Sequence, residues 1–221
     1  MRFSTLKDWL SWQEGLNPKH IDLGLDRVQQ VLEKLNLSSK FNCPVITVAG
    51  TNGKGSSVAM LESILRAGHY DVGCYTSPHL VKYNERIRIR GSDIDDQSLC
   101  RAFDQVDQAR GDIALTYFEF GTLAALVAFA EAELDVVVLE VGLGGRLDAV
   151  NVIDADVALV TSVDVDHTDW LGHDIESIAR EKAGIFRSGR PAVYGGLRVP
   201  ESVLQTAREK GSQLFVAGRD Y

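Results

Sequence analysis

An α/β fold is predicted by this sequence: a mainly parallel sheet flanked by helices, with a small antiparallel edge element. Short β-branched runs alternate with longer amphipathic stretches along most of the chain. Several of these runs are apolar at every position, as expected of strands that helices cover on both faces. Strands separated by helical stretches form βαβ units, and the strands of such units run parallel.

The expected strands and helices alternate in chain order. Strands are expected at Val45–Ala49, Val72–Thr76, Arg86–Arg90, Val136–Val141, Val157–Val163, Ala192–Tyr194 and Leu214–Val216. Helices are expected at Asp26–Leu35, Ser56–Ala67, Asp95–Ala109, Phe118–Glu133, Ile175–Phe186 and Glu201–Lys210. The run at Arg86–Arg90 alternates charged and apolar residues, which indicates a half-exposed edge strand or one arm of a hairpin. No internal repeat or Pro/Ser-rich linker divides the chain, so residues 1–221 are expected to form one domain.

Composition excludes several classes of protein. Of the 221 residues, 23 are Lys or Arg and 31 are Asp or Glu, so the formal net charge is −8. A nucleic-acid binder needs a basic face to release counterions, and we therefore expect no nucleic-acid partner. No apolar run reaches the roughly 18–20 residues that span a bilayer, and the N-terminus has no signal-peptide h-region, so no membrane association is expected. The three cysteines follow no zinc or disulfide spacing, which favours reduced thiols in a cytoplasm.

The segment PVITVAGTNGKGSSVAMLESIL passes from an apolar strand through a glycine-rich loop into a helix. Glycines let such a loop direct backbone N–H groups at phosphate oxygens, the helix N-terminus adds partial positive charge, and Lys54 can reach the outer phosphates. The match to the general P-loop pattern is imperfect, because Val48 stands where the first glycine belongs and Gly55 follows the lysine directly. A glycine-rich turn capped by Ser56 is the alternative. The order of strand, glycines, lysine and helix favours phosphate binding.

A second predicted strand delivers a carboxylate to its end. The segment VVVLEVGLGGRLDAVN places Glu140 there, followed by a glycine-rich loop and Asp148. Ligands collect at the carboxyl ends of parallel strands, and a carboxylate near a phosphate loop is well placed to hold Mg²⁺. Alternatively, backbone N–H groups of the glycine loop satisfy Glu140. Asp148 follows a loop, where an aspartate is commonly a helix cap.

Three other polar residues are ambiguous from their local sequence. Ser77 follows a strand and precedes a proline, so its hydroxyl can cap, form a turn or ligate a metal. His167, in VDVDHTDWLG, is suited to metal binding, acid–base chemistry or plain hydrogen bonding. Lys182, in SIAREKAGIF, lies on a predicted helix, where a solvated charge is the default interpretation.

The stretch LTYFEFGTLAALVAF opens a helix with Thr116, Tyr117, Phe118 and Glu119. Exposed aromatic rings beside a carboxylate suit a flat heterocycle. Aromatic residues at helical spacing more commonly belong to the core, so the pattern leaves both interpretations open.

Taken together and in this order, six motifs closely resemble the folylpolyglutamate synthase and dihydrofolate synthase family of Mur-ligase-like, ATP-dependent amide ligases. They are GTNGKGS, SPHL, TYFEFGT, LEVGLGGRLDA, DHTDWLG and EKAGIF. The TYFE form resembles the bacterial bifunctional members. The resemblance implies the P-loop NTPase-like fold of the Mur ligase central domain. It also implies a smaller C-terminal domain that this chain lacks, so the chain is expected to be the N-terminal part of the enzyme.

The resemblance also implies roles for the residues in these motifs. ATP phosphates would lie against Asn52, Gly53, Lys54, Gly55 and Ser56, and two Mg²⁺ sites are implied. Ser77 and Glu140 would bind the first Mg²⁺, and His167 the second, supported by Lys182 as a carbamate. The stretch that receives dihydropteroate would comprise Thr116, Tyr117, Phe118, Glu119, Leu147, Asp148 and Ala149, with Ile21–Gly24 near the pterin.

The implied activity is ATP-dependent addition of L-glutamate to dihydropteroate and to the glutamyl tail of tetrahydrofolates, through an acyl phosphate. Lys54, His167 and Lys182 would take part in catalysis, and the protein would be a cytoplasmic monomer. Two alternatives from other classes remain: an ATP-binding module without catalysis, and a P-loop NTPase or kinase that makes no amide product. Only the ligase would need glutamate to release ADP.

Overall fold

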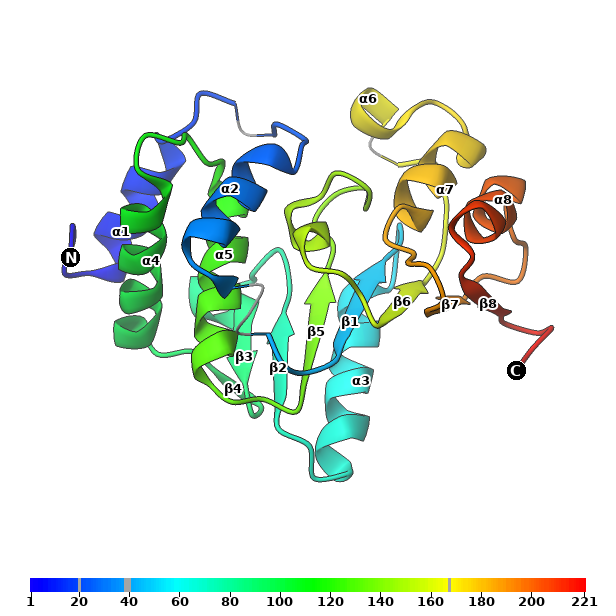
Figure 1. Ribbon diagram of the computed structural model, residues 1–221, viewed down its shortest axis with the longest axis horizontal. Coiled ribbons are helices and arrows are strands. Elements are labelled where there is room, and N and C mark those ends of the chain that lie inside the picture. Colours follow the sequence, from blue (N-terminus) through cyan, green and yellow to red (C-terminus); the bar gives the residue numbers. More distant parts are fainter. Residues whose placement is uncertain (20, 38–40, 167) are drawn as a thin grey trace.

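The sheet contains eight strands in the part of the chain that the computed structural model describes, residues 1–19, 21–37, 41–166 and 168–221 (Figure 1). The strands are β1 (Val45–Ala49), β2 (Val72–Tyr75), β3 (Ile87–Ile89), β4 (Ser92–Asp93), β5 (Val136–Glu140), β6 (Val157–Val160), β7 (Pro191–Tyr194) and β8 (Gln213–Val216). Their order across the sheet is β4-β3-β2-β5-β1-β6-β7-β8. All neighbouring pairs from β2 to β8 are parallel, whereas β3 runs antiparallel to both β2 and β4. The α/β fold and the antiparallel edge are thus confirmed.

Helices cover both faces of the sheet. The α-helices are α1 (Leu6–Glu14), α2 (Asp26–Lys34), α3 (Lys54–Ala67), α4 (Asp96–Arg110), α5 (Tyr117–Glu131), α6 (Thr168–Leu171), α7 (Ile175–Ala183) and α8 (Glu201–Lys210). Two short 3-10 helices are η2 (Tyr83–Arg86) and η3 (Ala149–Val152). Helix α3 packs on one face of β1, β2 and β5. Helix α5, with α1, α2 and α4 around it, covers the opposite face of these strands, and α7 and α8 lie near β7 and β8 (Figure 1).

The larger core lies between the sheet and α5. Every residue of this helix from position 119 to position 129 is buried, because α1, α2 and α4 surround it on the sides that face away from the sheet. A helix that is apolar all round is expected in such a place. Phe120, in the first turn of this helix, packs against Trp9, Trp12 and Phe103, with ring centroids 5.6–6.4 Å apart.

Strand β5 divides its side chains between the two faces. Val137 and Leu139 belong to the larger core, whereas Val136 and Val138 belong to a smaller cluster under α3. Side chains alternate along a strand, so Glu140 lies on the α3 face. The period of two therefore directs this carboxylate toward the start of α3, which is the glycine-rich loop predicted to bind phosphate.

Most of the predicted elements are present with small shifts at their ends, and β1 and α8 match the prediction at both ends. Strand β6 stops at Val160, short of the predicted Val163, because the next residues bond to the glycine-rich loop: Thr161 Oγ1 donates to the Asn52 carbonyl at 2.7 Å. Helix α7 ends at Ala183, short of Phe186, because Gly184 caps it. Sequence analysis missed α1, whose charged residues mask the burial of Trp9, and missed the two-residue strand β4.

Candidate active site

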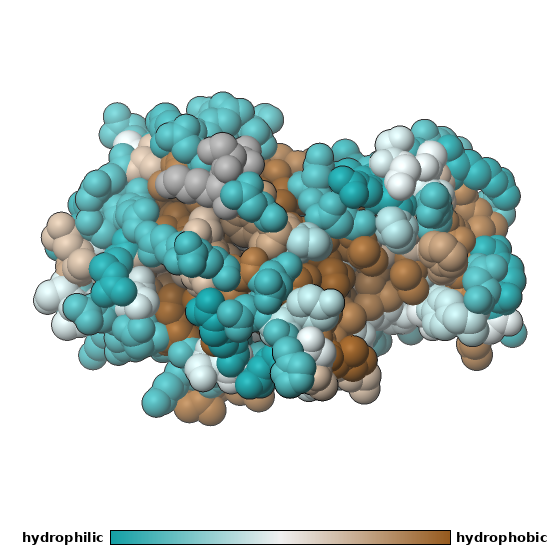
Figure 2. All heavy atoms as spheres, turned by 60° about the horizontal axis from the view of Figure 1, so that its bottom comes forward, coloured by the Kyte–Doolittle hydropathy of each residue, from teal (hydrophilic) through white to brown (hydrophobic). Residues whose placement is uncertain are grey.

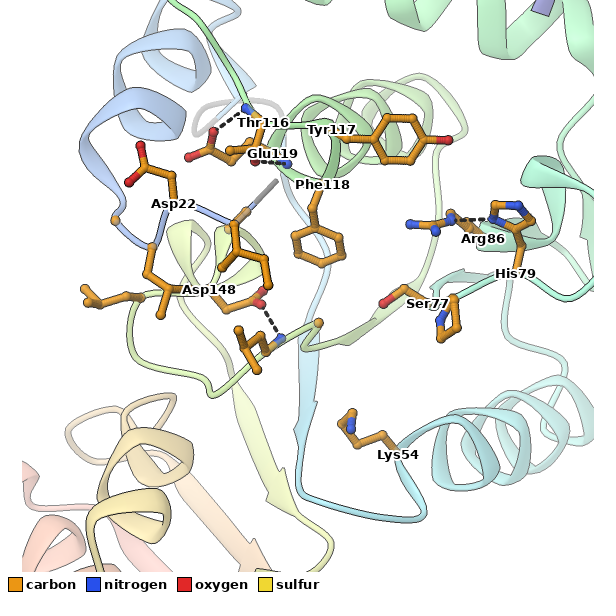
Figure 3. A pocket seen from close by; sticks show the side chains of 18 of the residues that line it. Asp22, Lys54, Ser77, His79, Arg86, Thr116, Tyr117, Phe118, Glu119 and Asp148 are labelled. Carbon is orange, nitrogen blue, oxygen red and sulfur yellow. Dashed lines mark hydrogen bonds between the residues drawn. The ribbon is translucent and has the colours of Figure 1, made fainter. Parts of the chain in front are cut away.

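Predicted site residues from several segments of the chain line one cavity of about 770 Å³ at the carboxyl ends of the parallel strands (Figure 3). The cavity is bounded by the segment after β2, by the start of α5, by the glycine-rich loops after β1 and β5, and by the segment before α2. Its lining includes Lys54, Ser77, His79, Arg86, Thr116, Tyr117, Phe118, Glu119, Leu147, Asp148 and Ala149. Open α/β sheets place their ligand sites at this edge.

The loop after β1 has the shape of a phosphate cradle. Gly53 adopts the left-handed conformation, with φ at 81°, immediately before α3 begins at Lys54. The Lys54 ammonium folds back and donates to the carbonyls of Gly50 (3.0 Å) and Thr51 (3.3 Å). Ser56 lies inside the helix and not at its cap, so the alternative of a turn capped by Ser56 is wrong. The loop therefore presents a helix N-terminus and a lysine to the same space.

Glu140 meets Ser77 beside this loop. The Glu140 side chain is buried, with 4% of the residue exposed, and its Oε2 accepts a hydrogen bond from the Ser77 N–H at 3.1 Å. A Cβ on Gly55 would lie 3.8 Å from the same carboxylate. Burial raises the Glu140 pKa, opposed by the Ser77 N–H and by Lys54. The alternative expected backbone N–H donors from the glycine loop after β5. The backbone donor to Glu140 is instead the N–H of Ser77.

Lys182 is buried against the loop that follows β5. Only 3% of the residue is exposed, so the interpretation as a solvated helix-face charge is wrong. Burial, and secondarily the positive charge of Lys54, lowers the Lys182 pKa to about 8, whereas Asp166 acts in the opposite direction. A Cβ on Gly145 would lie 2.7 Å from the Glu181 carbonyl oxygen, so a glycine is required where this loop crosses α7. The predicted metal ligand His167 lies outside the described residues.

Asp148 caps the short helix η3, as its position after a loop predicted. Its carboxylate accepts hydrogen bonds from the N–H groups of Leu143 (2.8 Å) and Val150 (3.0 Å). Burial raises the Asp148 pKa to about 7, against these backbone donors. The carboxylate thus fixes the loop whose residues Leu147 and Ala149 line the cavity.

The start of α5 is both core and cavity wall. Thr116 caps the helix and forms a capping box with Glu119, whose carboxylate also pairs with Arg27 at 2.9 Å. Tyr117 and Phe118 are only partly buried, and both rings line the cavity (Figure 3). A Cβ on Gly142 would lie 2.6 Å from the Phe118 ring, which indicates how closely the loop after β5 approaches it. The structure therefore combines the two interpretations of this aromatic stretch.

Sequence reasoning missed His79 and Arg86, which line the cavity, and Arg27, which lies behind two of its lining carboxylates. Arg27 pairs with both Asp22 and Glu119, and His79 and Arg86 form the wall beyond Ser77. Arg86 belongs to the alternating run ERIRIRG, which predicts exposed arginines, yet its side chain is buried. No local signal could have indicated this burial, because it depends on packing between η2 and α5.

The described residues contain no group of three or more His, Cys, Asp or Glu side chains placed to hold a metal ion. Any metal bound by Ser77 and Glu140 would therefore need further oxygen ligands from phosphates or water, which Mg²⁺ prefers. None of the helices in the described ranges is long and apolar enough to cross a membrane.

The fold and the phosphate loop define the class of protein. The Mur ligase middle domain family matches residues 48–195, and the chain belongs to this family. Among curated relatives, it is 56% identical over 218 residues to the dihydrofolate synthase/folylpolyglutamate synthase of Escherichia coli K12, covering 99% of this chain and 51% of the relative. It is 51% identical to the protein of that name from Haemophilus influenzae, over 98% of this chain and 49% of the relative. The chain thus spans about half the length of these relatives.

Solved structures agree with these sequence relatives. The structure of E. coli FolC in complex with DHPP and ADP matches 98% of this chain and 52% of its own, with a TM-score of 0.95 at 55% identity. A bifunctional folylpolyglutamate synthase/dihydrofolate synthase with Mn, AMPPNP and L-glutamate bound matches 96% of this chain and 52% of its own, with a TM-score of 0.90 at 54% identity. The predicted resemblance is confirmed.

Proposed function

We propose that this chain forms the ATP-binding and pterin-binding domain of a ligase that adds L-glutamate to dihydropteroate and to the glutamyl tail of tetrahydrofolates. One observation carries the proposal: a single cavity joins a phosphate loop to an aromatic wall, with Glu140 buried beside the loop. Such a cavity can hold ATP and a flat heterocycle at once. Support comes from the E. coli FolC structure with DHPP and ADP and from the related structure with AMPPNP and L-glutamate.

ATP would bind with its phosphates against the loop from Asn52 to Ser56. Backbone N–H groups at the start of α3 would donate to phosphate oxygens, and the helix dipole would favour their negative charge. Lys54 would exchange its two carbonyl partners, Gly50 and Thr51, for phosphate oxygens. A charge-assisted hydrogen bond is stronger than a bond to a neutral carbonyl, so the exchange is favourable.

Two Mg²⁺ sites are proposed. Ser77 and Glu140 would hold the first ion, which fits their oxygen donors, and His167 and carbamylated Lys182 would hold the second. When bound, Mg²⁺ neutralises charge on the phosphates. At pH 7 a lysine with a pKa of about 8 is neutral in about one molecule in ten, roughly 300 times more than an ordinary lysine. Only the neutral amine reacts with CO₂, so burial prepares Lys182 for carbamylation.

The pterin would occupy the space beside Phe118. We assign its contacts to Thr116, Tyr117, Phe118 and Glu119 on α5 and to Leu147, Asp148 and Ala149 after β5, with Ile21–Gly24 facing them. An aromatic ring next to buried carboxylates suits a flat heterocycle that carries amino and ring N–H donors. The Phe118 ring is fixed by Gly142 and by Tyr75, whose ring centroid is 5.9 Å away.

The proposed reaction has two steps. A carboxylate oxygen of the acceptor attacks the γ-phosphorus of ATP, the bond to the bridging oxygen breaks, and ADP leaves with that electron pair. The glutamate amine then attacks the carbonyl carbon of the acyl phosphate, loses a proton, and expels phosphate. Lys54 would stabilise the charge that develops on the transferring group, while the cavity holds the acceptor carboxylate in line.

Three further expectations belong to this proposal. We infer that residues 1–221 act as one domain, that the protein is monomeric, and that it works in the cytoplasm. The single sheet that runs from β4 to β8 supports the first, and the free thiols of Cys43, Cys74 and Cys100 are compatible with a reducing compartment. Light scattering after size-exclusion chromatography would test the second.

The activity is tested by ADP release with Mg-ATP, dihydropteroate and L-glutamate, omitting each substrate in turn, in the protein extended to the full length of its relatives. We expect release to require all three. Lys54→Ala and Glu140→Ala should each lower turnover at least 100-fold, whereas Lys7→Ala, on the exposed side of α1, should leave it unchanged. Release without glutamate would identify an NTPase or kinase instead. ATP binding without release would identify a non-catalytic module.

The carbamate is tested separately. Protein equilibrated with ¹³C-bicarbonate should give a carbamate signal in ¹³C NMR that Lys182→Ala abolishes. The absence of this signal at saturating bicarbonate would refute the carbamate and leave the ligase proposal intact.

A further inference from the structure

Arg86 is a buried cation in the wall of the cavity. It ends η2, only 9% of the residue is exposed, and it lines the cavity together with Ser77 and Phe118. Figure 3 shows its guanidinium directed from the His79 side toward the cavity. Neither the phosphate loop nor the pterin contacts proposed above use this residue.

Within the described part of the chain, Arg86 forms no ion pair. Its Nε donates to His79 Nδ1 at 2.9 Å, and its guanidinium carbon lies 5.1 Å and 5.7 Å from the ring centres of Tyr83 and Tyr117. Burial, and then the Arg86 charge itself, lowers the His79 pKa, while Glu85 acts in the opposite direction; the lowered pKa agrees with Nδ1 accepting this hydrogen bond. By contrast the equally buried Arg110 pairs with Asp107 at 2.8 Å. A buried charge without a counter-charge is costly, and bound anions commonly supply the missing charge.

The nearby carboxylates already have other partners. Glu85, which directly precedes Arg86 in the chain, accepts hydrogen bonds from the N–H groups of Leu80, Val81 and Lys82 at 2.7–3.0 Å. Across the cavity, Glu119 pairs with Arg27, and the Asp148 carboxylate accepts from backbone N–H groups. No described carboxylate pairs with Arg86, so a bound anionic ligand can supply its counter-charge.

We propose that Arg86 binds the α-carboxylate of the glutamyl tail when the acceptor is a folate, and so serves glutamyl extension more than dihydropteroate use. This inference rests on the proposed function. The carboxylate that becomes phosphorylated has to reach the phosphate loop at Lys54. In Figure 3, Lys54 and Arg86 lie on different sides of Ser77. A glutamyl tail ends in two carboxylates, one for each cation, whereas dihydropteroate has only one.

The surroundings of Arg86 hold the guanidinium in place for such a ligand. His79 fixes Nε, and the rings of Tyr83 and Tyr117, themselves edge-on with centroids 5.7 Å apart, limit the movement of the plane. The two terminal nitrogens of an arginine held this way match the two oxygens of a carboxylate. A preorganised fork loses little entropy on binding, so the pair contributes to affinity as well as orientation.

The test compares two acceptors in one variant series of the full-length protein. ADP release is measured with tetrahydrofolate and, in parallel, with dihydropteroate, for wild type, Arg86→Gln, Arg86→Lys and the control Arg90→Gln, which lies outside the cavity. Loss of a charge-assisted pair should raise the KM for tetrahydrofolate in Arg86→Gln by about 10- to 100-fold. The KM for dihydropteroate should change less than about threefold, and Arg86→Lys should recover part of the loss.

A tetrahydrofolate whose α-carboxylate is replaced by an amide keeps the inference falsifiable even if Arg86→Gln folds poorly. Wild type should bind this analogue as weakly as Arg86→Gln binds tetrahydrofolate. The Arg86→Gln variant should bind tetrahydrofolate and its amide analogue equally well. An equal loss for both acceptors in Arg86→Gln, or wild-type binding of the amide at full strength, would overturn the inference. A wild type that releases ADP without glutamate, or not at all, would instead overturn the proposed function.

Discussion

Gly145 allows the loop after β5 to lie against α7, and replacing it with alanine should measure that contact. A Cβ at this position would lie 2.7 Å from the Glu181 carbonyl oxygen, 2.9 Å from the Lys182 carbonyl oxygen and 3.1 Å from the Lys182 Cα. All three atoms belong to the backbone of a helix, so no side-chain rotation can relieve the overlap. The φ angle of Gly145 is not in the left-handed region, so the steric effect is isolated from backbone strain.

The magnitude follows from two opposing effects. Overpacking of a tight contact costs about 1–3 kcal/mol. Alanine also lowers the conformational entropy of the unfolded chain, which stabilises the folded protein by about 0.4–1 kcal/mol. Gly145→Ala should therefore lower the free energy of unfolding by about 1–2 kcal/mol, or the melting temperature by roughly 2–8 °C for a chain of this size.

Urea denaturation followed by circular dichroism would measure this change, with Gly15→Ala as the matched control. A Cβ at Gly15 meets only the Trp12 carbonyl oxygen, at an ordinary 3.7 Å, and its φ of −94° suits alanine. The control should be neutral or slightly stabilising. If Gly145→Ala were as stable as Gly15→Ala, the packing of this loop on the helix that carries Lys182 would be refuted.

Three further predictions concern charges and caps. The Lys182 pKa of about 8 lies below its ordinary 10.5, so folding is less favourable when this lysine is charged. The loss of folding free energy is complete below pH 8 and disappears as the pH rises to 10.5. In CO₂-free buffer, wild type should therefore gain stability over that interval relative to Lys182→Met, and parallel pH profiles would contradict this. Arg27→Met leaves the Glu119 carboxylate buried without its cation, which should cost about 1–3 kcal/mol after allowance for the partial exposure of Arg27; Glu119→Gln in the same chain should recover most of this in chemical denaturation. Asp95→Ala removes the N-cap of α4, which accepts from the Ser98 N–H at 2.9 Å, and thermal melts should show a loss of about 1 kcal/mol; an unchanged melting temperature would mean that the cap contributes nothing.

Elements with strong local signals were predictable from the sequence. Strand β1 is a run of apolar residues that a glycine loop ends, and α8 is an amphipathic helix closed by Gly211, so both were found with correct ends. Helix α1 was missed because its local pattern mixes Lys7 and Asp8 with apolar residues. Its burial comes from α4 and α5, which lie far away in the chain.

The site was predictable where a motif marks it and not where packing creates it. Lys54 begins α3 directly after the loop that follows β1, and Glu140 ends β5, at the edge of the sheet where ligands collect, and the order of the elements sufficed to bring them together. Burial of Lys182 was not visible, because it depends on the contact of Gly145 with α7. Burial of Arg86 depends on the rings of Tyr83 and Tyr117, and its alternating sequence pattern predicted the opposite.

The central claim is that the acceptor carboxylate is phosphorylated by ATP before glutamate attacks. It is tested most directly with dihydropteroate labelled with ¹⁸O in both carboxylate oxygens, incubated with Mg-ATP, L-glutamate and the full-length protein. Mass spectrometry of the released phosphate should detect one ¹⁸O atom for each amide formed, because the attacking oxygen leaves with phosphorus. Phosphate without ¹⁸O would show that ATP is hydrolysed by water, and would contradict the account.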